Sequence, residues 1–224
     1  MLNMSAKLHT QLKSLFPILM GLYIPMLILV AMIVLVGLQL SIPMADLTRD
    51  PSATTGDNLF IGVLSYIGVL FWCASVAICL FSFALLLKTG SIGEFSAFFL
   101  FGGLISLILL LDDLFLFHER VFPLYLNIPE KVVFLSYGLM ILGYITRFRK
   151  LILKTDFILM ILTFGLFGLS IVIDLLELRI SILFEDGSKL FGIVSWFGYL
   201  AITCFHAVKQ ITLQPADKKE QRFS

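Results

Sequence analysis

The chain has 224 residues, of which 59% are hydrophobic and only 14% are charged. A soluble domain usually has about 25% charged residues, so this composition excludes a water-soluble fold. The net charge of +1 excludes the strongly basic surface of a nucleic-acid-binding protein, and the partner that we expect is the lipid bilayer.

Six apolar segments follow one another along the chain, and each is close to the length that a helix needs to cross a bilayer. Their continuous runs favour helices over the alternating strands of a membrane barrel. We therefore predict an all-α, polytopic membrane bundle with helices at about 15–40, 59–87, 95–117, 131–147, 157–178 and 189–208. In this organisation residues 1–14 form a cytoplasmic N-terminal segment, residues 15–209 the bundle and residues 210–224 a polar cytoplasmic tail.

Basic residues indicate the orientation of the chain. With the N-terminus in the cytoplasm, 11 of the 16 Lys and Arg residues fall in cytoplasmic segments, and residues 147–154 (RFRKLILK) are the strongest marker. This bias predicts that both termini lie in the cytoplasm. By contrast, 11 of the 15 Asp and Glu residues fall on the outer side, which calls for a separate explanation.

The segment that ends the third span, LLLLDDLFLFHER, is the most informative. Asp112 and Asp113 follow a run of leucines, and His118 and Glu119 come soon after. On one straight helix, at 100° per residue, these four side chains cannot point to one spot. Either the helix ends near Phe117 and the following segment turns, or only some of the four residues form a site.

Further acids lie at the same predicted level. Asp174 and Glu177 end the fifth span, and Glu185 precedes the sixth. Asp112 lies 18 residues after Glu94 and Asp174 lies 18 residues after Asp156, and the two spans run in the same direction. We therefore expect both aspartates just inside the outer interface.

Carboxylates near hydrocarbon are costly unless they are paired, hydrated or bound to a cation. Several oxygen ligands around one imidazole suit a divalent cation such as Mg²⁺, Ca²⁺, Mn²⁺ or iron. The expected metal ligands are Asp112, His118, Glu119, Asp174 and Glu185, and the expected catalytic bases are Asp113 and Glu177. Such a site would bind or act on a lipid-like molecule at the head-group level.

Two other hypotheses compete with this one. In a non-catalytic subunit that assembles with other membrane proteins, the acids would pair with nearby bases, and Asp186 or Ser188 would cap the last helix. This hypothesis pairs the acids with Arg120 and Arg179, and Lys131 and Lys189 are also near enough in the sequence to pair with them. In a small proton- or cation-coupled transporter, charges would lie deeper, and the absence of charge at the span midpoints counts against it. Gly102, Gly103, Gly192 and Gly198 would permit close helix contacts under any of these hypotheses.

Two short patterns resemble small multi-pass bacterial membrane proteins of unassigned function. The first is the Asp-Asp pair followed by His-Glu, and the second is the EDG-K--G entry into the last helix. The matching residues are Asp112, Asp113, His118, Glu119, Glu185, Asp186, Gly187, Lys189 and Gly192. The resemblance covers about the second half of the chain, implies the bacterial inner membrane and supplies no activity. The three zinc-binding histidines of the ceramidase-like superfamily are missing, because only His118 falls on the outer side.

Overall fold

The computed structural model describes residues 62–90, 93–175 and 182–212, together with scattered positions between residues 13 and 56. The chain forms two compact units, residues 1–61 and 62–224. In the first unit the described positions include an apolar helical segment, Val30–Gln39. Residues 213–224 of the tail predicted at 210–224 and the acid Glu177 lie outside the described residues.

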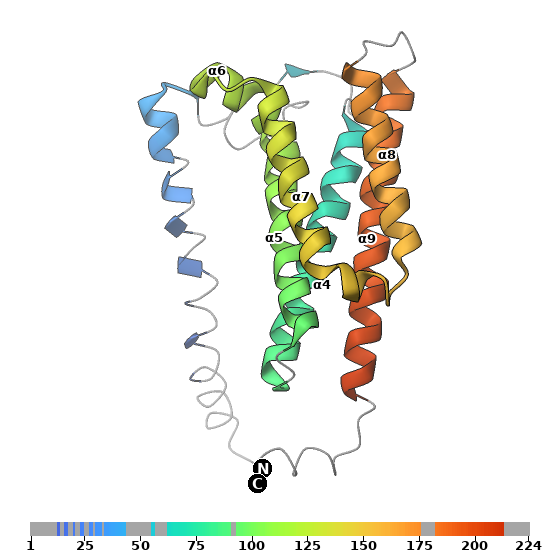
Figure 1. The fold of residues 1–224 in the computed structure, drawn as a ribbon. Coiled ribbons are helices and arrows are strands. Elements are labelled where there is room, and N and C mark those ends of the chain that lie inside the picture. The colour runs from blue at the N-terminus through green and yellow to red at the C-terminus, as the bar shows by residue number, and fades with distance from the viewer. Residues whose placement is uncertain are drawn as a thin grey trace. The chain divides into compact units, whose positions relative to one another are not determined.

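The regular elements in the described part of the second unit are all helices, joined by short turns (Figure 1). Its elements are α4 (Val63–Lys88), α5 (Glu94–Phe115), the π-helical turn η1 (Phe117–Val121), α6 (Phe122–Leu126), α7 (Glu130–Ile152), α8 (Phe157–Leu175) and α9 (Ile182–Thr212). No strand occurs among the described residues, which agrees with the predicted all-α class.

Four of these helices are long and apolar enough to cross a membrane. They are α4, α5, α7 and, within α9, the stretch Phe184–Gln210. The apolar part of α8, Phe157–Ile173, is shorter. The membrane class predicted from composition is thus supported by helix length and hydropathy together.

The observed helix bounds correct two predictions. α7 continues to Ile152, past the predicted end at residue 147, so the basic residues Arg149 and Lys150 form its last turn. α9 begins at Ile182 rather than 189, which places Asp186 and Ser188 inside the helix. The predicted capping of this helix by either residue is therefore wrong, and Ser188 donates instead to the Phe184 carbonyl at 2.6 Å.

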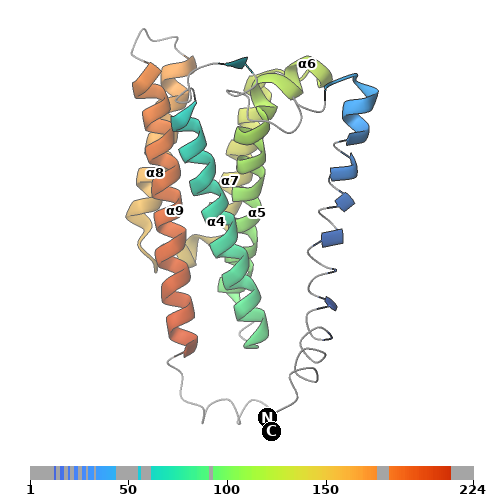
Figure 2. The same cartoon turned by 180° about the vertical axis from the view of Figure 1, so that it is seen from behind.

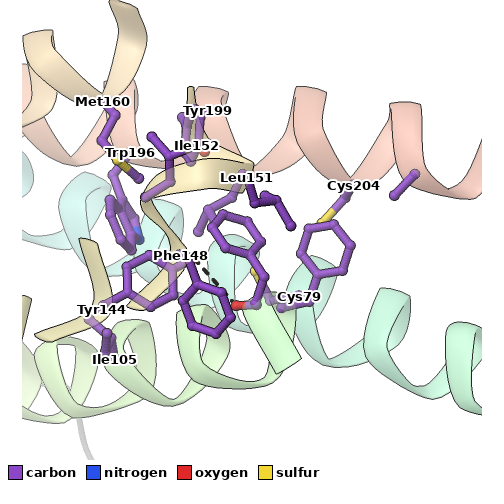
Figure 3. Packing of buried hydrophobic residues seen from close by; sticks show 14 of the residues in the cluster. Cys79, Ile105, Tyr144, Phe148, Leu151, Ile152, Met160, Trp196, Tyr199 and Cys204 are labelled. Carbon is purple, nitrogen blue, oxygen red and sulfur yellow. Dashed lines mark hydrogen bonds between the residues drawn. The ribbon is translucent and has the colours of Figure 1, made fainter. Parts of the chain in front are cut away.

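Helices α4, α5 and α9 form the centre of the unit. α4 packs against both α5 and α9, α7 packs against α5, and α8 packs against α9, as the view from behind also shows (Figure 2). Aromatic side chains fill the contacts (Figure 3). Phe98 stacks on Tyr144 and meets Phe148 and Tyr199 edge-on, and Trp196 donates to the Ser106 hydroxyl at 2.9 Å.

Glycines allow the helices to approach one another where α5 meets its neighbours. A Cβ on Gly103 would lie 3.2 Å from the Cβ of Cys79, and one on Gly102 would lie 3.0 Å from the Tyr144 hydroxyl. The close contacts predicted for Gly102, Gly103 and Gly192 are present. The one predicted for Gly198 is wrong, since no described atom lies within 4 Å of a Cβ placed there.

Candidate functional site

The end of α5 is where the predicted cluster forms. The helix stops at Phe115, and Leu116 adopts the left-handed conformation with φ 53° and ψ 44°. This conformation is unfavourable for a leucine, and it redirects the chain into the π-helical turn η1. Of the two arrangements open to the sequence, the structure has the one in which the helix ends before the His-Glu pair.

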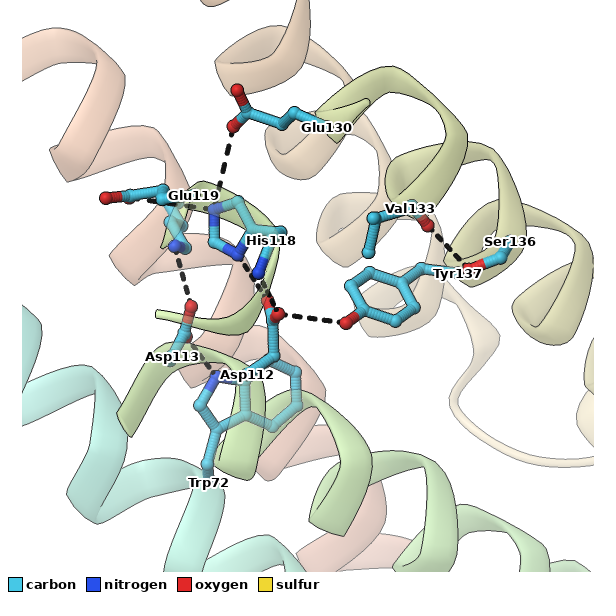
Figure 4. A network of polar contacts seen from close by, with 10 residues as sticks. Trp72, Asp112, Asp113, His118, Glu119, Glu130, Val133, Ser136 and Tyr137 are labelled. Atoms are coloured by element: carbon cyan, nitrogen blue, oxygen red, sulfur yellow. Dashed lines mark hydrogen bonds and ion pairs between the residues drawn. The ribbon is translucent and has the colours of Figure 1, made fainter. Parts of the chain in front are cut away.

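The turn brings His118 back onto Asp112. The backbone N–H of His118 donates to Asp112 Oδ1 at 2.9 Å, and the ring atom Nδ1 lies 2.6 Å from Oδ2 (Figure 4). Both side chains are buried, with relative exposures of 3% for Asp112 and 5% for His118. Tyr137 of α7 adds a third contact, because its hydroxyl donates to Oδ1 at 2.9 Å.

These contacts determine which ring nitrogen of His118 can accept a proton. Oδ1 of Asp112 already accepts from a backbone N–H and a phenol, and Oδ2 presents its lone pairs to the ring as a further acceptor. Nδ1 of His118 therefore donates to Asp112, and in the neutral imidazole Nε2 carries the lone pair. Nε2 lies 3.6 Å from Glu119 Oε1 and 3.9 Å from Glu130 Oε1, both on exposed side chains.

The environment of His118 favours its protonated form. Burial by itself would lower the pKa of the ring, but the hydrogen bond and the charge of Asp112 outweigh burial. Glu119 acts in the same direction and Lys189 acts against it. The result is a pKa above the ordinary value of 6.5.

Asp113 belongs to a second, adjoining set of contacts. Its Oδ2 accepts a hydrogen bond from Trp72 Nε1 of α4 at 2.8 Å, and its Oδ1 lies 2.7 Å from Lys189 Nζ of α9. The carboxylate is 11% exposed and the lysine 41%. One pair of neighbouring aspartates therefore ties together α4, α5, α7 and α9.

The oxygens of both aspartates are already engaged by protein donors. Within the part of the chain that the structure describes, no group of three or more His, Cys, Asp or Glu side chains is placed to hold a metal ion. The structure therefore does not support the predicted metal binding among these residues. Two further predicted residues, Glu177 and the side chain of Asp174, lie outside the described residues, and Glu185 lies in the first turn of α9.

Sequence reasoning missed three contributors to the cluster. Tyr137 and Trp72 lie within apolar spans, and Glu130 is the first residue of α7. A usable signal existed for Trp72 and Tyr137: a buried indole N–H or phenol O–H requires a partner, and acids at the same membrane level supply one. Lys189 was expected among the bases that could pair with the acids, and it contacts Asp113.

Comparison with known proteins identifies the family. A model described as a domain of unknown function (DUF8692) matches residues 25–203. The chain belongs to this family. Neither the curated proteins nor the solved structures provide a match. Family membership thus agrees with the expected resemblance in one respect, namely that the family has no assigned function.

Proposed function

We propose that this chain is a six-span protein of the bacterial inner membrane with both termini in the cytoplasm. The distribution of Lys and Arg supports this orientation. Lys88, Arg149 and Lys150 lie in the last turns of α4 and α7, at helix ends that the proposal assigns to the cytoplasm. The C-terminal end of α5, with Asp112 and Asp113, would then face the outer head groups.

We further propose that Asp112 and His118 form a proton-accepting site that binds or acts on a lipid-like molecule. The observation that carries this proposal is the 2.6 Å contact between Asp112 Oδ2 and His118 Nδ1. A carboxylate in this position fixes the tautomer and orientation of the ring and stabilises the imidazolium after proton uptake. His118 Nε2 is the accepting atom, and Asp112 is its orienting partner.

The roles of the other acids follow from their contacts. Asp113 is less suited to act as a base, because Trp72 and Lys189 occupy both of its oxygens. Glu119 and Glu130 flank Nε2 from exposed positions, so they would guide protons or a polar head group to the ring. We therefore assign proton transfer to His118 in place of the metal-assisted chemistry expected from the sequence.

Charge indicates which head group the site would accept. Four carboxylates and one ammonium leave a formal charge of −3 around a neutral imidazole; the groups are Asp112, Asp113, Glu119, Glu130 and Lys189. Such a site repels an anionic head group and attracts a cationic one. The proposed ligand class is an amphipathic molecule with an ammonium or a hydroxyl at its polar end.

Proton binding is tested by nuclear magnetic resonance of the protein in lipid nanodiscs with ¹⁵N-labelled histidine. The chain has three histidines, so a His118→Asn spectrum identifies the signal. We expect the His118 midpoint to lie above 6.5 and to fall in Asp112→Asn, since the amide removes the charge that stabilises imidazolium. A midpoint that is unchanged in Asp112→Asn would overturn the proposal. A chelator should leave the midpoint unchanged, whereas a bound cation would shift it.

Ligand preference is tested by native mass spectrometry of the detergent-purified protein. We expect phosphatidylethanolamine to be retained in preference to phosphatidylglycerol, and Glu119→Gln with Glu130→Gln to remove this preference, since both carboxylates lie beside Nε2. Retention of the anionic lipid in preference to the other would contradict the proposed ligand class.

A second function is favoured by the contacts of Asp113. Its ion pair and hydrogen bond connect three helices, which is what a non-catalytic membrane subunit would need to present a fixed surface to another membrane protein. This function predicts that Asp113→Asn abolishes co-purification of a partner, while His118→Asn leaves co-purification unchanged. Loss of lipid preference without loss of a partner would favour the proton-accepting site.

A further inference from the structure

A row of contacts leads from α8 and α9 to the buried end of α5. The ring of Phe167 in α8 stacks on Trp72 of α4, with centroids 6.2 Å apart and planes 16° from parallel. Trp72 Nε1 donates to Asp113 at 2.8 Å, and Asp113 holds Lys189 at 2.7 Å. The position of the Lys189 ammonium therefore depends on the Trp72 indole, and that indole is in contact with Phe167 of α8.

Gly192 makes room for that phenylalanine. A Cβ on Gly192 would lie 2.8 Å from both Cδ1 and Cε1 of Phe167, a distance that side chains do not tolerate. The α9 backbone thus serves as the surface against which the ring rests. Gly198 in the same helix differs, since no described atom lies within 4 Å of a Cβ added there.

The location of Lys189 matters to the imidazole. Its positive charge opposes the effect of Asp112 on the proton affinity of His118. Asp112 from α5, Glu119 from η1 and Glu130 from α7 contact the ring itself, and Tyr137 from α7, Asp113 from α5 and Lys189 from α9 lie in the next layer of contacts around Asp112 and His118. Lys189 is the lone ammonium among these described groups, so moving it changes the field at Nε2.

We propose that Phe167 and Gly192 are positioning residues of the site: they hold Trp72 against Asp113, and Asp113 in turn holds Lys189 beside the Asp112–His118 pair. This inference rests on the proposed function of that pair. It assigns a role to residues on α8 and α9 that touch neither Asp112 nor His118. It also gives a physical reason for the lysine and the last glycine of the EDG-K--G segment, Lys189 and Gly192.

The test combines two signals in the full-length protein in nanodiscs. The chain has two tryptophans, so a Trp72→Phe spectrum identifies the indole N–H signal of Trp72. In Phe167→Leu we expect this signal to shift and the His118 midpoint to rise by roughly half a pH unit, because Lys189 is held less closely. Phe167→Tyr retains the stacking ring and should restore both values. Phe191→Leu, at an exposed position of α9, is the matched control.

A double-mutant cycle checks the part played by the glycine. Gly192→Ala should change both signals, whereas Gly198→Ala should change neither. In a Phe167→Leu background Gly192→Ala should add little, because the ring that it displaces is gone. If Gly192→Ala does not fold, the Phe167 variants alone decide.

The two proposals fail in different ways. An unchanged Trp72 signal and an unchanged His118 midpoint in Phe167→Leu would overturn the positioning role, while a normal response to Asp112→Asn would leave the proton-accepting site standing. A His118 midpoint that ignores Asp112→Asn would remove the proposed function itself. A Trp72 shift without a change in midpoint would show that the ring only packs, and would also overturn the inference.

Discussion

His118 donates both its backbone N–H and its ring Nδ1–H to one carboxylate, that of Asp112, at 2.9 and 2.6 Å. The two residues are six positions apart, and the left-handed Leu116 between them makes the double contact feasible. The pair therefore depends on the helix break as much as on the side chains that form it.

The first prediction concerns stability and pH. The pKa of His118 is raised in the folded protein, so its contribution to stability is fully present below about pH 6.5 and is lost as the pH rises through the folded-state pKa. The unfolding temperature of the wild type should exceed that of His118→Asn by more at about pH 5.5 than at about pH 9. A difference that grows toward alkaline pH would contradict the assignment.

The second prediction concerns Tyr137. Its hydroxyl donates to a buried carboxylate, so Tyr137→Phe should lower the free energy of unfolding by about 1.5–3 kcal/mol. Denaturant titration in detergent measures the change. Tyr125→Phe is the control, because Tyr125 is 81% exposed. Equal effects of the two substitutions would show that the contact with Asp112 contributes nothing.

The third prediction concerns the ion pair of Asp113. Lys189→Met leaves a carboxylate that is 11% exposed without its counter-charge. The loss of stability should stay below the roughly 3–5 kcal/mol of a fully buried pair, because Lys189 is itself 41% exposed. Adding Asp113→Asn should recover part of the loss in a thermal unfolding assay. Strictly additive effects would mean that the two groups do not interact.

The fourth prediction concerns helix packing. Gly103→Ala should destabilise the bundle by about 1–3 kcal/mol, since its Cβ would lie 3.2 Å from atoms of Cys79 and Leu80 on α4. Gly138→Ala on α7 meets no described atom within 4 Å and should be neutral or stabilising by up to about 1 kcal/mol. Unfolding of both variants under one condition provides the comparison. A more stable Gly103→Ala variant would show that α4 and α5 do not pack as described.

Apolar run length was enough to predict the helical class and the approximate position of α4, α5 and α7. The end of α9 that carries Glu185 and Asp186 was placed outside its helix, because charged residues there interrupted the apolar run. A helix extends past such residues when its backbone hydrogen bonds continue, and Glu185, Asp186 and Ser188 lie within that extension. Hydropathy therefore located the spans better than their ends.

Within the site, the sequence indicated the Asp112 and His118 region but not its partners. Spacing along one helix cannot reveal a left-handed residue at Leu116, where no glycine or proline marks the break. Nor can spacing show that Trp72 and Tyr137, from two other helices, donate hydrogen bonds to the neighbouring carboxylates of Asp113 and Asp112. The metal site was predicted from the number of acids. The hydrogen-bond donors that occupy the aspartate oxygens come from helices far apart in the chain, so the sequence pattern could not reveal them.

The two adjacent aspartates acquire their partners at different stages of chain synthesis. Asp112 can be satisfied by His118 as soon as α5 has ended, because that partner lies six residues later. Asp113 has no counter-charge until α9, which carries Lys189, has been synthesised. During membrane insertion, the Asp113 carboxylate would thus remain without a counter-charge until α9 packs against α5. The energetic cost of that unpaired charge would favour packing of α9 onto the bundle over its separation into the lipid.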